Sequence, residues 1–183
     1  MERLNDEQLN SIELPLLEWY YDQASILHTD LVRAESIITE RGYTLLAIYF
    51  GILTASIGYV LTHLDMKDDI ALTSGCISLI VFCCIAIWYI YKVIQPHSFY
   101  PPGREPNKLN LEGYIDYFKK RGVTEDDQKK RVVSDELLNL QTKITEQDKL
   151  NRERVEQTRH SIRFILFGSL MAVVTFLIAL FIY

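Results

Sequence analysis

The stretch Ile70–Tyr91, IALTSGCISLIVFCCIAIWYIY, contains no Asp, Glu, Lys or Arg. Two more stretches share this character, Gly42–His63 (GYTLLAIYFGILTASIGYVLTH) and Phe164–Tyr183 (FILFGSLMAVVTFLIALFIY). We call the three, in chain order, the first, second and third apolar segments. An uncharged run of about 20 residues matches a hydrocarbon layer of roughly 30 Å, whereas a buried helix of a soluble protein is shorter and keeps a polar stripe. The sequence therefore predicts three transmembrane helices.

The charged residues lie mainly outside these segments. They fill positions 1–41 and 92–163 of the 183-residue chain, whose formal net charge is −5. So much apolar sequence in a short chain favours one membrane unit over several soluble domains. The predicted fold is an all-α integral membrane protein, with three transmembrane helices and a cytoplasmic helical region. The expected regions are a cytoplasmic N-terminal amphipathic helix (1–42), a two-span hairpin (43–94), a cytoplasmic Pro-rich loop with helices (95–162) and a C-terminal transmembrane helix (163–183).

The distribution of Lys and Arg predicts the orientation. Positions 92–163 hold fifteen of the nineteen Lys and Arg residues, whereas the loop His63–Asp69 has only Lys67 against three Asp. Basic loops stay in the cytoplasm. We therefore expect the N-terminus and 92–163 to be cytoplasmic and the C-terminus to lie outside. Because the first 42 residues are acidic and lack an apolar run, we expect no signal peptide.

Residues 7–41 have the periodicity of an amphipathic helix that runs into the first apolar segment, with Pro15 near its start. The apolar residues that recur at spacings of three and four form its expected packing face: Leu9, Ile12, Leu16, Trp19 and Tyr20, and then Leu27, Leu31, Ala34 and Ile38. The opposite face is acidic, which favours packing on other helices over contact with anionic lipid.

The next cytoplasmic stretch is the proline-rich loop 95–108, which carries Tyr100 and Arg104, followed by a short helix over Leu109–Arg121. Gly122 suits the left-handed residue after that helix, and Thr124 suits the cap of the next. No Pro or Gly occurs between Thr124 and Arg163, so this last helix should pass directly into the third apolar segment.

The last helix carries a coiled-coil seam of Val133, Leu137, Leu140 and Ile144, spaced 4, 3 and 4. We predict that these four residues form an oligomer seam, although about two heptads are too few to hold a coiled coil alone. The same spacing then passes through polar residues, Gln147, Asn151 and Arg154. These could specify register or surround water on the axis of an oligomer.

A basic cluster precedes the third apolar segment, consisting of Arg152, Arg154, Arg159, His160 and Arg163. One interpretation is a positive-inside signal with contact to anionic lipid. The other is a ring of cations, formed in an oligomer, that binds a phosphate-bearing ligand. The candidate ligand- or partner-binding residues are Tyr100, Arg104, Arg152, Arg154 and Arg159.

The sequence carries no recognisable catalytic, nucleotide-binding or metal-ligand motif, so we expect no enzyme, no cofactor and no metal, and it has no direct nucleic-acid-binding motif. Cys76, Cys83 and Cys84 are expected to be buried thiols. No Asp, Glu, Lys or Arg lies within an apolar segment, which argues against a conventional coupled transporter. Small-residue pairs such as Gly51–Ala55 and Gly168–Ala172 could pack helices within one chain or between copies.

The layout resembles that of small bacterial membrane effectors of antiphage defence, above all the Pycsar transmembrane effectors and the related SLATT-type proteins. The stretches that carry the resemblance are TDLVRAESIITERGYTLL (29–46), PHSFYPPGREPNKLN (96–110), YIDYFKK (114–120) and LNRERVEQTRHSIRFILFG (150–168). The resemblance implies a protein of the bacterial inner membrane that is silent until infection. It would then oligomerise or rearrange and impair membrane integrity, so that the host cell stops growing before phage are released. This response is abortive infection.

The same resemblance implies a partner that triggers this change. In Pycsar the trigger is a cyclic pyrimidine nucleotide. Because this chain shows no recognisable nucleotide-binding domain, a regulatory protein of the same defence system is equally allowed. Alternatively, the chain is a membrane-anchored scaffold that recruits a cytosolic partner through its helices, or a small constitutive channel.

Overall fold

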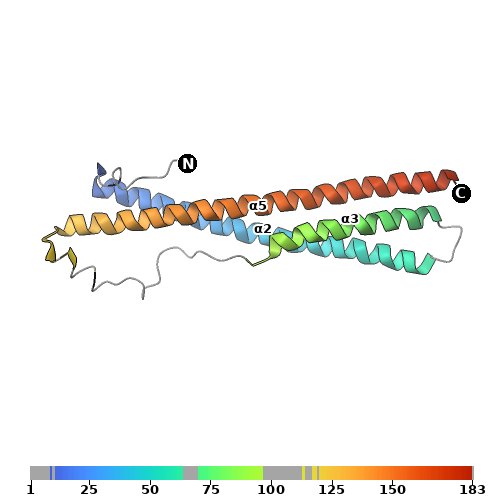
Figure 1. Ribbon diagram of the computed structural model, residues 1–183, viewed down its shortest axis with the longest axis horizontal. Coiled ribbons are helices and arrows are strands. Elements are labelled where there is room, and N and C mark those ends of the chain that lie inside the picture. The colour runs from blue at the N-terminus through green and yellow to red at the C-terminus, as the bar shows by residue number, and fades with distance from the viewer. Residues whose placement is uncertain are drawn as a thin grey trace. The chain divides into compact units, whose positions relative to one another are not determined.

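The structure is a computed structural model that describes Leu9 and residues 11–63, 70–96, 113, 117–118 and 120–182. Its principal elements are three helices, α2 (Leu14–His63), α3 (Ile70–Ile94) and α5 (Glu125–Ile182) (Figure 1). Each of the three is long and apolar enough to cross a membrane. Within the part of the chain that the structure describes, this finding confirms the predicted helical architecture and the three helices that are able to span a bilayer.

Several predicted features lie outside the described residues. They are the loop between the first two apolar segments, nearly all of the proline-rich loop with Tyr100 and Arg104, and most of the short helix at 109–121. These predictions stay as they were made from the sequence.

The described residues form two compact units. The first draws on Met1–Ala34 and Ser98–Leu150, and the second on Glu35–His97 and Asn151–Tyr183. Both α2 and α5 therefore contribute to each unit. The four regions expected from the sequence were divided by their position relative to a membrane, and they stay predictions. The two units are instead defined by which residues pack together.

Both local signals at the start of α5 are confirmed. Gly122 has a φ of 62°, and the amide of Val123 donates to the carbonyl of Phe118, which is the hydrogen bond of a Schellman turn. The hydroxyl of Thr124 then accepts from the amide of Asp127 at 3.3 Å. Acidic residues fill the first turn, where the helix dipole favours them. From there α5 continues without a break to Ile182, as the sequence predicted.

In the first unit, Leu9, Leu17 and Leu137 form a buried cluster that Val133 and Tyr21 extend. The prediction that Leu16, Trp19 and Tyr20 supply the packing face of the N-terminal helix is wrong. They are 48%, 54% and 43% exposed.

The packing face of α2 lies one residue further along the chain. It begins with Leu17, and the positions that follow at spacings of 4 and 3 are Tyr21, Ala24, His28 and Leu31, of which His28 is fully buried. Such a 3.5-residue repeat faces one partner helix over many turns. The stripe through Leu16 and Trp19 meets Gln23 after one turn, so it cannot form a continuous seam.

An ion pair between Lys129 and Glu18, 2.5 Å apart, also joins α2 and α5 in the first unit. The hydrogen bond that Lys129 donates to Glu18 raises the pKa of Lys129 above its ordinary value. Any stabilisation from this pair is present at neutral pH and is lost as the pH rises through that raised pKa. Because both side chains are largely exposed, the pair contributes little.

The α5 seam does not stop where its apolar residues stop. The same alternation of 4 and 3 passes through Gln147, Asn151 and Arg154, which are all buried, and reaches into the third apolar segment. It includes Ser161, just before that segment, and Gly168 within it, which are also buried. A single face of α5 therefore serves both the polar and the apolar part of the helix.

In the second unit, α3 lies beside parts of α2 and α5 (Figure 1). Tyr49, Ala86, Ile90 and Val93 form its core, and side chains of α5 such as Phe164 pack against them. The unit holds few buried large side chains, so its stability depends on close approach of the helices.

Three glycines make that approach possible. A Cβ atom on Gly42 of α2 would lie 2.9 Å from Cγ2 of Ile94 on α3. A Cβ atom on Gly168 would lie 2.4 Å from the Cβ of Phe82, and one on Gly75 would lie 3.0 Å from the carbonyl oxygen of Ala172. The Gly168–Ala172 pair therefore packs within the chain. Gly51 is exposed, and a Cβ there would meet no described atom within 4 Å.

We expect Gly168→Leu to destabilise the protein, because the backbones of α3 and α5 must separate to admit the side chain. The expected loss is about 1–3 kcal/mol or more. Gly51→Leu is the matched control and should change stability by less than about 0.5 kcal/mol. Thermal unfolding of the purified protein in detergent, followed by tryptophan fluorescence, measures both. Equal shifts for the two variants would contradict this packing.

Candidate functional site

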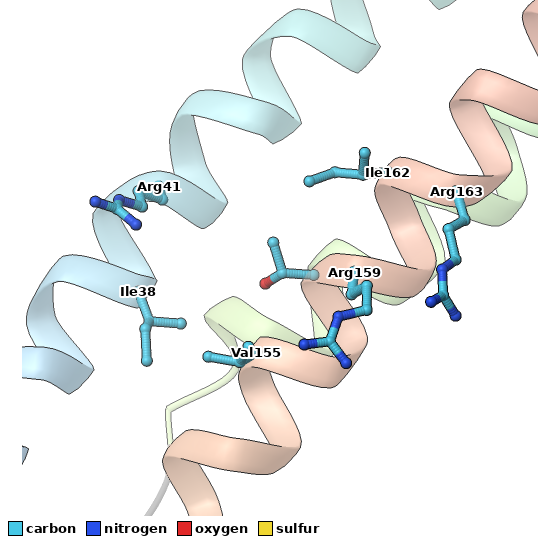
Figure 2. A pocket seen from close by; sticks show the side chains of 7 residues that line it. Ile38, Arg41, Val155, Arg159, Ile162 and Arg163 are labelled. Carbon is cyan, nitrogen blue, oxygen red and sulfur yellow. The ribbon is translucent and has the colours of Figure 1, made fainter.

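The basic residues predicted as one cluster lie on two different sides of α5. Arg152, Arg159 and Arg163 are exposed, whereas Arg154 is buried. Arg159 pairs with Glu156 at 2.7 Å and, with Arg163, lines a groove that α2 completes through Ile38 and Arg41 (Figure 2). The candidate site of the molecule is centred on the buried member, Arg154.

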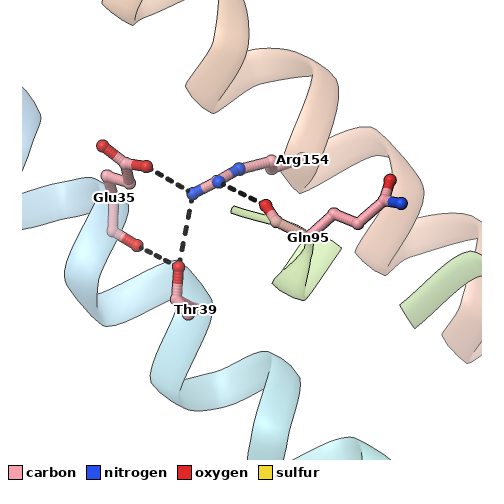
Figure 3. A network of polar contacts seen from close by, with 4 residues as sticks. All are labelled: Glu35, Thr39, Gln95 and Arg154. Carbon is pink, nitrogen blue, oxygen red and sulfur yellow. Dashed lines mark hydrogen bonds and ion pairs between the residues drawn. The ribbon is translucent and has the colours of Figure 1, made fainter. Parts of the chain in front are cut away.

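Arg154 connects all three helices of the second unit (Figure 3). On α2, its Nη1 donates to Glu35 Oε1 at 2.8 Å and to the hydroxyl of Thr39 at 3.3 Å. Its Nη2 donates to the carbonyl oxygen of Gln95, just after α3, at 3.2 Å. One guanidinium therefore holds α5 to both neighbouring helices.

The end of α3 makes the Gln95 carbonyl a suitable acceptor. The last carbonyls of a helix have no partner within the helix, and they carry its negative dipole end. The Gln95 amide still bonds to the carbonyl of Tyr91, so the chain remains helical up to this point. The guanidinium of Arg154 donates a hydrogen bond to a carbonyl at that end, and its positive charge interacts favourably with the negative end of the helix dipole.

Burial makes this contact energetically demanding. Only 6% of the Arg154 side chain is exposed, against 22% for Glu35. A buried cation without a counter-charge is strongly unfavourable, whereas a paired and hydrogen-bonded one can be roughly neutral. Glu35 supplies the charge, while Thr39 and Gln95 supply further acceptors. The planar, forked guanidinium reaches all three, which an ammonium group cannot do with the same geometry.

A second polar contact lies further along the seam. The hydroxyl of Ser161 on α5 donates to the hydroxyl of Tyr49 on α2 at 3.1 Å, and both residues are buried. Polar pairs between apolar layers fix the register of two helices, because a shift would leave them unsatisfied. Arg154 and Ser161 therefore give α2 and α5 one register in this unit.

Aromatic and basic side chains surround the end of α3. Lys92 lies over the rings of Trp88 and Tyr89, at 5.4 and 5.8 Å from their centroids. On the other side, the ring of Tyr89 stacks on Phe164 of α5 at 5.3 Å. These contacts place the aromatic residues where polar sequence gives way to the apolar segments.

The predicted seam residues lie in the first unit. Leu137, Leu140 and Ile144 are buried within the chain, and Val133 packs on the cluster of Leu9, Leu17 and Leu137. In the single chain the seam therefore has a partner in α2. Its role between subunits stays a prediction, as does ligand or partner binding by Arg152, Arg154 and Arg159.

Sequence reasoning missed the partners of Arg154. Glu35 belongs to the 4-and-3 spacing that begins at Leu17, so its position in the seam was a readable signal. Nothing in the sequence indicated Thr39 or the Gln95 carbonyl. Among the described residues, no group of three or more His, Cys, Asp or Glu side chains could hold a metal ion. The arrangement around Arg154 suits a structural link or switch between helices.

We expect Arg154→Ala to cost about 2–4 kcal/mol, because partly buried Glu35 would lose the guanidinium that now faces it. The apparent Tm should fall by about 5–15 °C, and Arg154→Lys should recover only part of this loss. Arg152→Ala, two residues away and exposed, is the control and should leave the Tm nearly unchanged. A full recovery by lysine would show that charge alone, without the forked geometry, is sufficient.

Comparisons of the chain with protein-family models, with curated proteins and with solved structures found no match. Its function is therefore inferred from its own residues and their arrangement.

Proposed function

We propose that the protein is an integral membrane effector of bacterial antiphage defence that, once activated, impairs the inner membrane. In this proposal the Arg154 link holds the silent state. The cytoplasmic parts of α2 and α5 receive the signal, and the apolar parts of the same helices act in the bilayer.

The outward surface of the second unit supports membrane insertion. Large apolar side chains stand exposed along all three apolar segments, including Leu61, Val81, Leu166 and Phe181, the last at 87%. A soluble monomer rarely exposes so continuous an apolar surface. Lipid would cover it, and the aromatic residues and Lys92 at the end of α3 would lie in the headgroup layer. With basic residues inside, the N-terminus and 92–163 are cytoplasmic in this proposal.

The observation that carries the proposal is the position of Arg154. It lies in the last turns of polar sequence before the third apolar segment, on a helix that runs unbroken from Glu125 to Ile182. Its partner Glu35 lies at the equivalent place on α2, which runs unbroken from Leu14 to His63. A displacement of the cytoplasmic helices would therefore act on the spans through continuous helices. A buried ion pair has two distinct arrangements, paired and broken, as a switch requires.

The resemblance to Pycsar and SLATT-type effectors supports the biological setting. It suggests a cyclic nucleotide or a regulatory protein of the defence system as the trigger, and assembly into oligomers as the response. The exposed face of α2 around Gly51 is suited to contact between copies, because a small residue allows close approach of helices.

A second candidate function is a membrane-anchored scaffold. The exposed stripe of Leu16, Trp19 and Tyr20 on α2 favours it, since apolar and aromatic side chains are typical of a protein-binding surface. A scaffold would recruit its partner without changing the permeability of the membrane.

Membrane potential in bacteria distinguishes the two functions. Cells that express the chain from a tightly controlled promoter should keep their potential until phage infection or overexpression and then lose it. Arg154→Ala should depolarise uninfected cells at a lower expression level than the unaltered chain, because the silent state has lost its link. Arg33→Ala, which removes an exposed arginine two residues before Glu35, should behave like the unaltered chain.

The amount of protein in the membrane fraction must be equal for all three chains, as measured by immunoblot. A normal potential on infection and at high expression of the unaltered chain would contradict the effector and leave the scaffold as the better account.

A further inference from the structure

We propose that the groove between α2 and α5 binds one anionic phospholipid. This inference rests on the membrane insertion proposed above and is independent of the role in defence. The groove has a volume of about 330 Å³ and is lined by both apolar and cationic side chains.

The two kinds of side chain come from both helices. Ile38 on α2 and Val155 and Ile162 on α5 face the space between the helices (Figure 2). Arg41, Arg159 and Arg163 also line the groove and are exposed. Apolar walls beside guanidinium groups are complementary to an amphiphile with an acyl part and an anionic head. The apolar walls fit the acyl part, and each guanidinium group can donate two parallel hydrogen bonds to the oxygens of a phosphate.

The position of the arginines favours a lipid over a soluble phosphate. Arg41 directly precedes the first apolar segment, and Arg163 directly precedes the third. In the inserted protein both would lie at the depth of the phospholipid headgroups, where polybasic sites bind anionic lipids. An acyl chain could then follow the apolar side chains into the bilayer.

The hydrogen-bonding groups of the groove also favour a lipid phosphate as the ligand. The hydroxyl of Thr158, the remaining lining residue, already donates to the carbonyl of Arg154. Arginine side chains therefore supply the charged donors of the groove. The lining contains no amide or carboxylate side chain of the kind that pairs with the edge of a nucleotide base, whereas a phosphate diester needs only donors.

This groove also adjoins the Arg154 link. Val155 follows Arg154 directly in the chain, and Ile38 lies next to Thr39, which accepts a hydrogen bond from Arg154. A lipid held across α2 and α5 would keep the two helices together. The inferred lipid is therefore a stabilising ligand of the state in which Arg154 is paired.

The test uses the full chain in nanodiscs of phosphatidylcholine mixed with phosphatidylglycerol, and native mass spectrometry of the lipid retained when the protein is released. The unaltered protein should retain one phosphatidylglycerol in preference to phosphatidylcholine. The triple variant Arg41→Gln, Arg159→Gln, Arg163→Gln should retain it at least about tenfold less. Val155→Trp, which fills the groove and keeps its arginines, should also lose it.

The control is the triple variant Arg33→Gln, Arg121→Gln, Arg131→Gln, which removes the same charge from exposed positions outside the groove. It should retain phosphatidylglycerol normally, and an equal loss would overturn the assignment to this groove. No preference for phosphatidylglycerol would overturn the inference, and so would equally tight binding of soluble glycerophosphate. A change of oligomeric state in the groove variants, without loss of lipid, would indicate a second copy as the occupant. Failure to enter nanodiscs would instead contradict membrane insertion itself.

Discussion

A buried charge at the meeting point of three helices is the constraint on which the second unit depends. Arg154 must find a counter-charge and further acceptors, and Glu35, Thr39 and Gln95 provide them from two other helices. Because an unpaired guanidinium inside a protein is strongly unfavourable, only an arrangement that brings these groups together is acceptable. Apolar residues at both positions, 35 and 154, could contribute as much stability, but they would not fix which turns of the helices must meet.

The seam explains how the Arg154 contact can affect both the polar and the apolar part of α5. In α5, one 3.5-residue repeat runs from Val133 through Arg154 to Gly168. The residues of this repeat change from leucines, to polar side chains, to Gly168, which lies against the side chain of Phe82. A continuous repeat resists local slippage, because a shift at one layer displaces every other layer. The polar seam residues just before the third apolar segment are therefore well placed to control the packing of that segment.

Much of the fold could be predicted from the sequence, because the signals involved are local. Absence of charge marked the three apolar segments, Gly122 and Thr124 marked the start of α5, and the lack of Pro and Gly marked its continuity. Around Leu16, Trp19 and Tyr20 the packing face of α2 was predicted one residue out of register, because two apolar stripes compete there and only packing selects one. Leu31 and Ile38, predicted on the same helix, do lie on the observed face. Arg154 was grouped with its charged neighbours, since its carboxylate partner lies 119 residues away in the chain. Contacts of that separation leave no local pattern.

The most direct test of this account is a double-mutant cycle between Glu35→Gln and Arg154→Gln. Stabilities of the four proteins in detergent, followed by the fluorescence of Trp19 and Trp88, give the coupling free energy between the two side chains. We expect the double variant to be more stable than the sum of the single losses predicts, with a coupling of at least about 1.5 kcal/mol. A coupling below about 0.5 kcal/mol would show that the two side chains act independently, and the buried pair would then not be the link between the helices.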